Sequence, residues 1–157
     1  MKVKDVMRSD VMFVRPHWTV FDCARIFEKN NISGAPVVEN GRVVGIVSIS
    51  DIVKFMGMKL MDADVFAEEP QGLSMLLLNL AKMGKDYVDF KKEVERISKI
   101  SVREVMSRFV VSVAPSTNVY EAAKIMDEND VNRLPVIHNG KLIGILARQD
   151  LVRALLK

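Results

Sequence analysis

Apolar side chains after residue 19 recur at intervals of three and four residues, which is the spacing of an amphipathic helix. The residues that share this face are Val20, Cys23, Ala24 and Phe27. Thr19 stands where a side-chain oxygen caps the first free amides of a helix. The pattern therefore predicts a helix that begins after Thr19 and buries its apolar face.

Two apolar runs follow this helix and predict a β-hairpin. Residues 35–38 and 43–49 are rich in β-branched side chains, and the Asn40-Gly41 pair between them favours the positive φ angles of a two-residue turn. A further helix is predicted to open at Asp51, whose carboxylate can cap it. Ahead of the first helix, residues 11–14 end shortly before a proline and predict a short strand.

The whole pattern occurs twice in the chain. An offset of 99 residues places residues 3–54 on residues 102–153 without a gap, and 18 of these 52 positions are identical. The second copy has its own helix cap at Asn118, hairpin turn at Asn139-Gly140 and helix opening at Asp150. Its predicted strands are residues 110–113, 134–137 and 142–148. An ungapped match of this length indicates a duplication.

The order of elements in each copy is strand, helix, strand, strand, helix, which is a mixed α/β (α+β) unit. One copy offers a three-stranded sheet with helices on one side, too small to bury both faces well. We therefore expect the two copies to pack sheet to sheet about a pseudo-twofold axis. The predicted boundaries are residues 1–57 for the first repeat, 58–99 for a helical connector and 100–157 for the second repeat.

The connector is the part of the chain that is not repeated. We predict two helices in it, residues 73–83 and 86–97, separated by Gly84. Its apolar residues either pack on their own domain or form a surface for a partner or a second copy, and the sequence leaves both open. The residues concerned are Leu73, Met75, Leu76, Leu77 and Leu80.

Composition narrows the class of protein. Hydrophobic residues make up 49% and charged residues 27% of the chain, and the net charge of +3 permits anion binding without demanding it. The single cysteine, Cys23, excludes an internal disulfide and a Cys-rich zinc site. Neither a membrane-length apolar run nor a signal-peptide core occurs in the sequence. We expect a soluble, cytoplasmic protein with no membrane partner.

Each copy resembles a CBS motif, and the pair resembles the tandem CBS arrangement called a Bateman module. The residues that carry this resemblance in the first copy are Val6-Met7, Pro16, Ala24, Pro36-Val37, Asn40-Gly41, Gly45-Ile46 and Asp51, and all of them recur in the second copy. The resemblance implies two clefts between the repeats that take AMP, ADP, ATP or S-adenosylmethionine as a regulatory ligand, with no required cofactor. It also implies a non-enzymatic energy sensor that forms a homodimer and regulates a separate partner protein.

Residues 45–51 read Gly-Ile-Val-Ser-Ile-Ser-Asp, which resembles the ligand motif of this family. The Ser48 hydroxyl would lie near a helix amino terminus, which is a natural anion site. The two carboxylate oxygens of Asp51 suit the paired hydroxyls of a ribose, and Ile46 would flank the adenine. The alternative is that Ser48 and Asp51 only cap the helix, which leaves the same trace in the sequence.

The second copy departs from this motif. Asp150 is retained, but Ala147 replaces the serine, and Arg133 stands where the first copy has Gly34. The resemblance implies that a basic residue at this place reaches phosphate, to which a guanidinium can make bidentate bonds. We therefore predict unequal clefts, one with the Ser48–Asp51 pair and no arginine, the other with Asp150 and Arg133 and no hydroxyl. Arg133 could instead be an ordinary solvated surface residue.

The resemblance also implies that each cleft borrows residues from the opposite copy. For the Asp51 cleft these are Met106, Val111 and Val131. For the Asp150 cleft they are Met7, Met12 and Ile32. Ile145, the counterpart of Ile46, completes the apolar set, and Ser33, Gly34 and Asn132 would bond to the adenine edge.

Catalytic parts are scarce in the sequence. Cys23 sits on an apolar helix face and aligns with Ala122 of the other copy, and His17 and His138 fall at different places in the repeat. Walker-type loops and metal-ligand spacings are missing as well. We therefore expect neither catalytic residues nor a metal site.

Two further functions stay open. A nucleic-acid-binding regulator is suggested by the basic residues Lys91, Lys92, Arg96 and Lys99. Because Glu93 and Glu95 interleave them, a solvated helix face fits better and nucleic acid is not the expected partner. An interaction scaffold with vestigial clefts is suggested by Ala147 and Gly34, which lack ligand-binding side chains.

Overall fold

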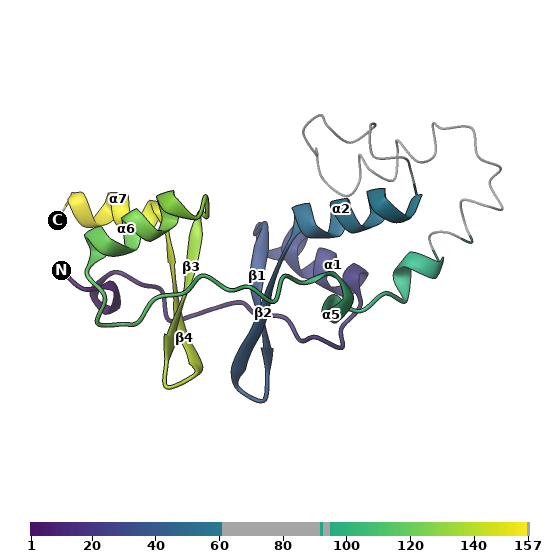
Figure 1. Cartoon of the computed structure of the whole chain (residues 1–157), viewed down its shortest axis with the longest axis horizontal. Coiled ribbons are helices and arrows are strands. Elements are labelled where there is room, and N and C mark those ends of the chain that lie inside the picture. The colour runs from purple at the N-terminus through teal and green to yellow at the C-terminus, as the bar shows by residue number, and fades with distance from the viewer. Residues whose placement is uncertain (61–91, 93–94, 157) are drawn as a thin grey trace.

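A computed structural model describes residues 1–60, 92 and 95–156 of the chain (Figure 1). The predicted connector helix 73–83, most of the predicted helix 86–97 and the apolar residues 73–80 lie outside the described residues. The helices are η1 (Val3–Asp5), α1 (Val20–Asn30), α2 (Ile49–Leu60), α5 (Val102–Val105), α6 (Val119–Glu128) and α7 (Arg148–Leu155). The strands are β1 (Gly34–Glu39), β2 (Arg42–Ser48), β3 (Arg133–His138) and β4 (Lys141–Ala147).

The strands form two antiparallel hairpins that meet at their inner edges in the order β1-β2-β4-β3. One antiparallel pair, Arg42 with Lys141, joins the hairpins. In Figure 1 the hairpins stand side by side, with α1 and α2 beside β1 and β2, and α6 and α7 beside β3 and β4. The mixed α/β class and the paired arrangement of the repeats are therefore confirmed.

The local rules for turns and caps hold in both repeats. Asn40 and Gly41 have φ angles of 51° and 76°, and Asn139 and Gly140 have 51° and 77°, as a two-residue hairpin turn requires. The Thr19 hydroxyl accepts a 3.1 Å hydrogen bond from the Asp22 amide at the start of α1. These turns and caps agree with the sequence prediction because each depends only on residues next to it in the chain.

The prediction of a strand at the start of each repeat is wrong. Residues 11–14 contribute only one parallel bridge, Val14 to Val37, and residues 110–113 contribute only Val113 to Val136. Val14 still donates to Pro36 (3.0 Å) and accepts from Val38 (2.9 Å). Pairing does not continue past Val14, because the chain turns at Pro16, whose nitrogen has no hydrogen to donate. Before Val14, Val11 and Met12 line a cleft and do not pair with β1.

The last helix of each repeat also begins earlier than predicted. α2 starts at Ile49 and α7 at Arg148, so Asp51 and Asp150 stand in the first turn and not at the cap. The residue before each helix, Ser48 or Ala147, takes the capping position. An acid in the first turn can reach back to the free amide of that residue, which is the reciprocal half of a capping box.

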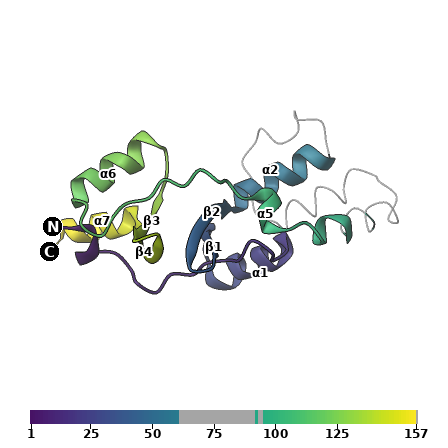
Figure 2. The ribbon, with the colours of Figure 1, turned by 60° about the horizontal axis from the view of Figure 1, so that its bottom comes forward.

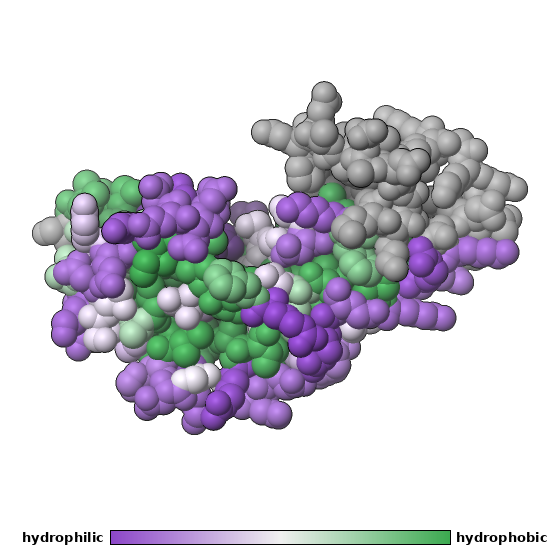
Figure 3. Space-filling view, viewed as in Figure 1, coloured by the Kyte–Doolittle hydropathy of each residue, from purple (hydrophilic) through white to green (hydrophobic). Residues whose placement is uncertain are grey.

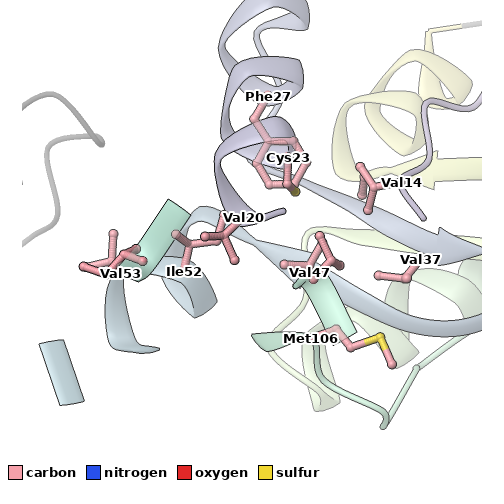
Figure 4. Packing of buried hydrophobic residues seen from close by; sticks show 12 residues of the cluster. Val14, Val20, Cys23, Phe27, Val37, Val47, Ile52, Val53 and Met106 are labelled. Carbon is pink, nitrogen blue, oxygen red and sulfur yellow. The ribbon is translucent and has the colours of Figure 1, made fainter. Parts of the chain in front are cut away.

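The hydrophobic cores of the two repeats exchange their first segments. Val102 packs among Val14, Val37 and Val47 of the first repeat, whereas Val3 packs in the core of the second. The backbone fixes this exchange, because Val20 donates to the Ile100 oxygen (2.9 Å). Both views show α5 beside α1 (Figures 1 and 2). Met106 directly follows α5, and Figure 4 shows it among the side chains of the first core. The repeats are therefore tied to each other through their cores.

Candidate functional site

Two clefts open between the repeats, and each is lined from both of them. The cleft around Asp51 has a volume of about 610 Å³ and the cleft around Asp150 about 550 Å³. We call them the Asp51 cleft and the Asp150 cleft. Predicted site residues that line the Asp51 cleft are Ser33, Gly34, Ile46, Ser48, Asp51, Val111, Val131, Asn132, Arg133 and Ile145. Those that line the Asp150 cleft are Met12, Ile32, Gly34, Asn132, Arg133, Ile145 and Asp150.

The wall of the Asp51 cleft is partly apolar. Val111 and the exposed Phe109 come from the segment that joins α5 to α6, and Val131 comes from the loop after α6. Figure 3 shows hydrophobic surface in the middle of this face, over the strands and that joining segment, with hydrophilic surface around it. Such a wall suits the flat, weakly polar ring of a base.

Ser48 and Asp51 form a closed capping box at the start of α2. One oxygen of Asp51, Oδ2, accepts from the Ser48 amide (2.8 Å) and the Ser48 hydroxyl (2.7 Å), and Ser48 Oγ accepts from the Asp51 amide (3.2 Å). The capping role left open by the sequence is therefore real. Within the described residues, however, the other oxygen of Asp51 has no partner, so it is free to accept from a ligand in the cleft.

Asp150 occupies the same place in the second repeat with a different set of partners. Its Oδ2 accepts from the Ala147 amide at 2.9 Å, as in the first repeat. Its Oδ1 accepts from Arg8 Nε at 3.0 Å, and Arg153 Nη1 lies 3.5 Å from the same oxygen. Only 4% of the Asp150 side chain is exposed. Both oxygens of this carboxylate are thus used within the protein.

Arg133 lines both clefts, so the prediction that the Asp51 cleft lacks an arginine is wrong. Its guanidinium donates a 3.5 Å hydrogen bond to the carbonyl oxygen of Gly34. Arg133 and Gly34 are the first residues of β3 and β1, and this hydrogen bond joins the two repeats at the ends of these strands. We call this boundary between the repeats the seam. The Asp51 cleft therefore holds a free carboxylate oxygen and a guanidinium together.

The two predicted methionines Met7 and Met106 do not line the clefts. Met106 is 8% exposed and belongs to the first core, and its sulfur packs over Gly45, where an added Cβ would lie 2.6 Å from Sδ. Met7 packs over Gly144 in the same way. These two side chains therefore pack against β2 and β4 and not into the clefts.

Sequence reasoning missed several lining residues. Ser107 and Phe109 line the Asp51 cleft, and Arg8, Asp10 and Arg148 line the Asp150 cleft. Arg8 and Ser107 directly follow the two paired methionines, so the alignment of the repeats already placed them at one position. Their different chemistry was the signal that could have been used.

Metal ligands and the Cys23 thiol are the groups among the described residues that bear on catalysis. No set of three His, Cys, Asp or Glu side chains there could hold a metal ion. Burial raises the pKa of the Cys23 thiol to about 12, and the Asp22 carboxylate adds to this shift, so the thiolate is not accessible near neutral pH. Among these residues, too, no helix is long and apolar enough to span a bilayer.

The sequence model of the CBS domain matches residues 3–57 and 102–157. The chain belongs to the CBS domain family. Its two repeats make a CBS pair, and its structural neighbours are CBS-pair proteins. Protein MJ1426 of Methanocaldococcus jannaschii is 37% identical over 158 residues, covering 99% of this chain and 92% of that protein.

Two solved CBS structures resemble this chain over nearly all of its length. The structure of CBSX2 in complex with AMP is 28% identical with a TM-score of 0.67, covering 99% of this chain and 96% of that one. CBSX2 is a protein of Arabidopsis thaliana. MJ1225 of M. jannaschii, described as a candidate archaeal homologue of γ-AMPK, is 25% identical with a TM-score of 0.73, covering 98% of this chain and 47% of that one.

Proposed function

We propose that this CBS pair is a regulatory module that binds an adenosine-containing ligand between its repeats and signals to a partner protein. The observation that carries the proposal is the composition of the Asp51 cleft. A carboxylate oxygen without a partner among the described residues, an apolar wall and the Arg133 guanidinium line one cavity of about 610 Å³. That volume is in the range of small-molecule sites.

Each part of an adenine nucleotide has a counterpart in this cleft. The free oxygen of Asp51 accepts from the ribose hydroxyls, since a carboxylate has lone pairs for both. Ile46, Val111 and Val131 line the same cleft and would contact the faces of the base. Arg133 supplies charge-assisted hydrogen bonds to phosphate oxygens. The AMP complex of CBSX2, a relative with the same fold, supports this choice of ligand class.

Binding would regulate by shifting a population. Because residues of both repeats line the cleft, a bound nucleotide contacts both and favours the relative angle at which all contacts form. The surface shown to a partner then changes with occupancy. Exposed apolar side chains on the helices of the second repeat, Tyr120, Val152 and Leu155, offer a surface for a homodimer or a regulated protein.

An interaction scaffold without a ligand is the second candidate. It is favoured by the capping box itself, because the hydrogen bonds between Ser48 and Asp51 give both residues a structural role at the start of α2 without any ligand. In that case the clefts stay empty and only the exposed apolar surface functions.

Calorimetric titration with AMP, ADP, ATP and S-adenosylmethionine, with GMP and IMP as controls, tests the proposal. Asp51→Asn should weaken binding of the preferred adenosine compound by roughly tenfold or more, because an amide accepts more weakly than a carboxylate. Asp22→Asn is a matched control, since Thr19 and Asp22 form the same capping box at α1, away from the clefts. Its affinity should equal that of the wild type.

The failure of this test is equally definite. If ligand-free protein gives no heat with any adenosine compound, the scaffold is the better function. If Asp22→Asn weakens binding as much as Asp51→Asn, helix capping and not ligand contact explains the effect. Binding of duplex DNA with a steep dependence on salt concentration would instead favour the nucleic-acid regulator.

A further inference from the structure

Arg8 and Ser107 occupy equivalent positions in the two repeats. Arg8 follows Met7 and Ser107 follows Met106, and these two methionines align with each other in the repeats. The backbone of each residue makes the same hydrogen bonds. Arg8 exchanges two 2.9 Å hydrogen bonds with Ile145, and Ser107 exchanges two 2.9 Å hydrogen bonds with Ile46. Each side chain therefore enters the cleft at the same place, Arg8 in the Asp150 cleft and Ser107 in the Asp51 cleft.

The two side chains act differently on the aspartate beside them. Arg8 Nε binds Asp150 Oδ1 at 3.0 Å, and the Asp150 carboxylate is 4% exposed. Ser107 is too short to do the same, and its hydroxyl turns to the Phe109 carbonyl oxygen at 3.3 Å. As a result, Asp51 keeps an oxygen without a partner among the described residues, whereas Asp150 keeps none.

We infer that Arg8 is an internal competitor for the ribose position and closes the Asp150 cleft to nucleosides, so that each chain binds one adenine nucleotide, in the Asp51 cleft. A ribose in the Asp150 cleft has to displace a guanidinium from a buried carboxylate. Displacing Arg8 removes the shortest ion pair of a carboxylate that is 4% exposed and leaves it only Arg153, at 3.5 Å, as a charged partner, which is unfavourable. The Asp51 cleft presents no such barrier. This inference rests on the proposed function.

Exchanging the two residues tests it, with AMP as the probe and calorimetry or equilibrium dialysis as the measurement. The wild type should bind one AMP per chain. Arg8→Ser, which copies the first repeat into the second, should raise this to two. Ser107→Arg, which copies the second repeat into the first, should lower the affinity of the one site at least tenfold.

Ser107→Arg also guards the test against misfolding. Arg8→Ser leaves Asp150 with fewer partners and could unfold the chain, whereas Ser107→Arg adds a partner to an aspartate that has a free oxygen. If Arg8→Ser is unfolded by circular dichroism, the wild-type stoichiometry and Ser107→Arg decide the question. Two AMP per wild-type chain, or unchanged affinity in folded Ser107→Arg, overturns the inference while the proposed function stands.

The two proposals fail in different ways. If the wild type binds no AMP but folded Arg8→Ser binds one, Arg8 blocks the Asp150 cleft as inferred, whereas binding in the Asp51 cleft and the proposed function of the wild type are wrong for this ligand. If the wild type binds one AMP and folded Arg8→Ser also binds one, the inference is wrong and nucleotide binding stands. If neither binds AMP, both are wrong for this ligand.

Discussion

The Arg133 guanidinium donates to the carbonyl oxygen of Gly34 at 3.5 Å, and the two residues are equivalent positions of the two repeats. A residue and its own counterpart therefore meet at the seam between the repeats. Since Gly34 has no side chain, Arg133 extends over the position and lines both clefts. The cation that the first repeat lacks is supplied by the second.

This placement predicts a phosphate-specific effect of Arg133→Ala. The affinity for AMP should fall roughly tenfold or more, because a hydrogen bond to a charged group contributes about 1.5–3 kcal/mol. The affinity for adenosine, which has no phosphate, should change little. Parallel calorimetric titrations with AMP and adenosine measure the difference.

Arg148→Ala is the matched control for that experiment. Arg148 lines the Asp150 cleft but not the Asp51 cleft, so its loss removes one positive charge nearby without removing the contact. AMP affinity equal to that of the wild type is expected. An equal fall in both variants would mean that overall charge, and not contact with phosphate, governs binding.

The residues that precede α2 and α7 predict that Ser48→Ala and Ala147→Ser change the free energy of unfolding in opposite directions. Ser48→Ala removes a hydroxyl that accepts from the Asp51 amide at 3.2 Å and should lower the free energy of unfolding by about 1 kcal/mol. Ala147 precedes α7 and provides no side-chain cap. Ala147→Ser should therefore raise the free energy of unfolding, by about 0.5–1 kcal/mol.

Urea denaturation followed by circular dichroism measures both changes. Thr19→Ala is the control for the size of a cap, because its hydroxyl makes the same contact at α1 (3.1 Å). Destabilisation by Ala147→Ser would show that the second repeat cannot accommodate a capping hydroxyl, and that its alanine has a steric reason.

Features that depend on neighbouring residues could be predicted from the sequence. The Asn-Gly turns, the caps at Thr19 and Asn118 and the two-copy organisation all follow from local chemistry and the internal alignment. The first strand of each repeat could not, because the pattern of residues 11–14 is that of a strand. Whether such a segment pairs over its length depends on where the chain runs next.

Contacts between the repeats were harder to predict. The exchange of Val3 and Val102 between the cores, and the presence of Arg133 in both clefts, depend on how two distant segments meet. The resemblance named most of the lining residues but assigned Met7 and Met106 to the clefts. Their positions over Gly144 and Gly45 follow from packing that no local pattern contains.

These glycine contacts predict that Gly45→Ala disturbs both stability and binding. The new Cβ would lie 2.6 Å from Met106 Sδ and 2.8 Å from the Ser107 carbonyl oxygen. Relieving this overlap should cost about 1–3 kcal/mol of the free energy of unfolding. Because Ser107 lines the Asp51 cleft, its displacement should also weaken AMP binding.

Gly144→Ala is the control for Gly45→Ala. Its Cβ would lie 2.6 Å from Met7 Sδ and 3.0 Å from the Arg8 carbonyl oxygen, beside the Asp150 cleft. Denaturation should show a similar loss of stability, whereas calorimetry should show unchanged affinity for AMP. Weaker binding in both variants would contradict the assignment of the nucleotide to the Asp51 cleft.

The last prediction concerns the pH dependence of stability. Burial raises the pKa of the Cys23 thiol from 9.0 to about 12, with a further contribution from Asp22. Because the folded thiol has the higher pKa, its contribution to the free energy of unfolding is fully present at pH values below the pKa of the unfolded thiol. This contribution is lost as pH rises from about 9 toward 12, because only the unfolded chain then ionises, at about 1.4 kcal/mol for each pH unit.

Cys23→Ala is the natural comparison, since Ala122 is buried at the equivalent position of the second repeat. Between pH 8 and pH 10 the free energy of unfolding of the wild type should fall by roughly 1 kcal/mol more than that of Cys23→Ala. Urea denaturation at the two pH values measures this. The native thiol should also react far more slowly with a disulfide reagent than the unfolded one, because a buried, protonated thiol is a poor nucleophile. Equal pH dependence in the two proteins, or rapid reaction of the native thiol, would show that Cys23 ionises readily within the fold.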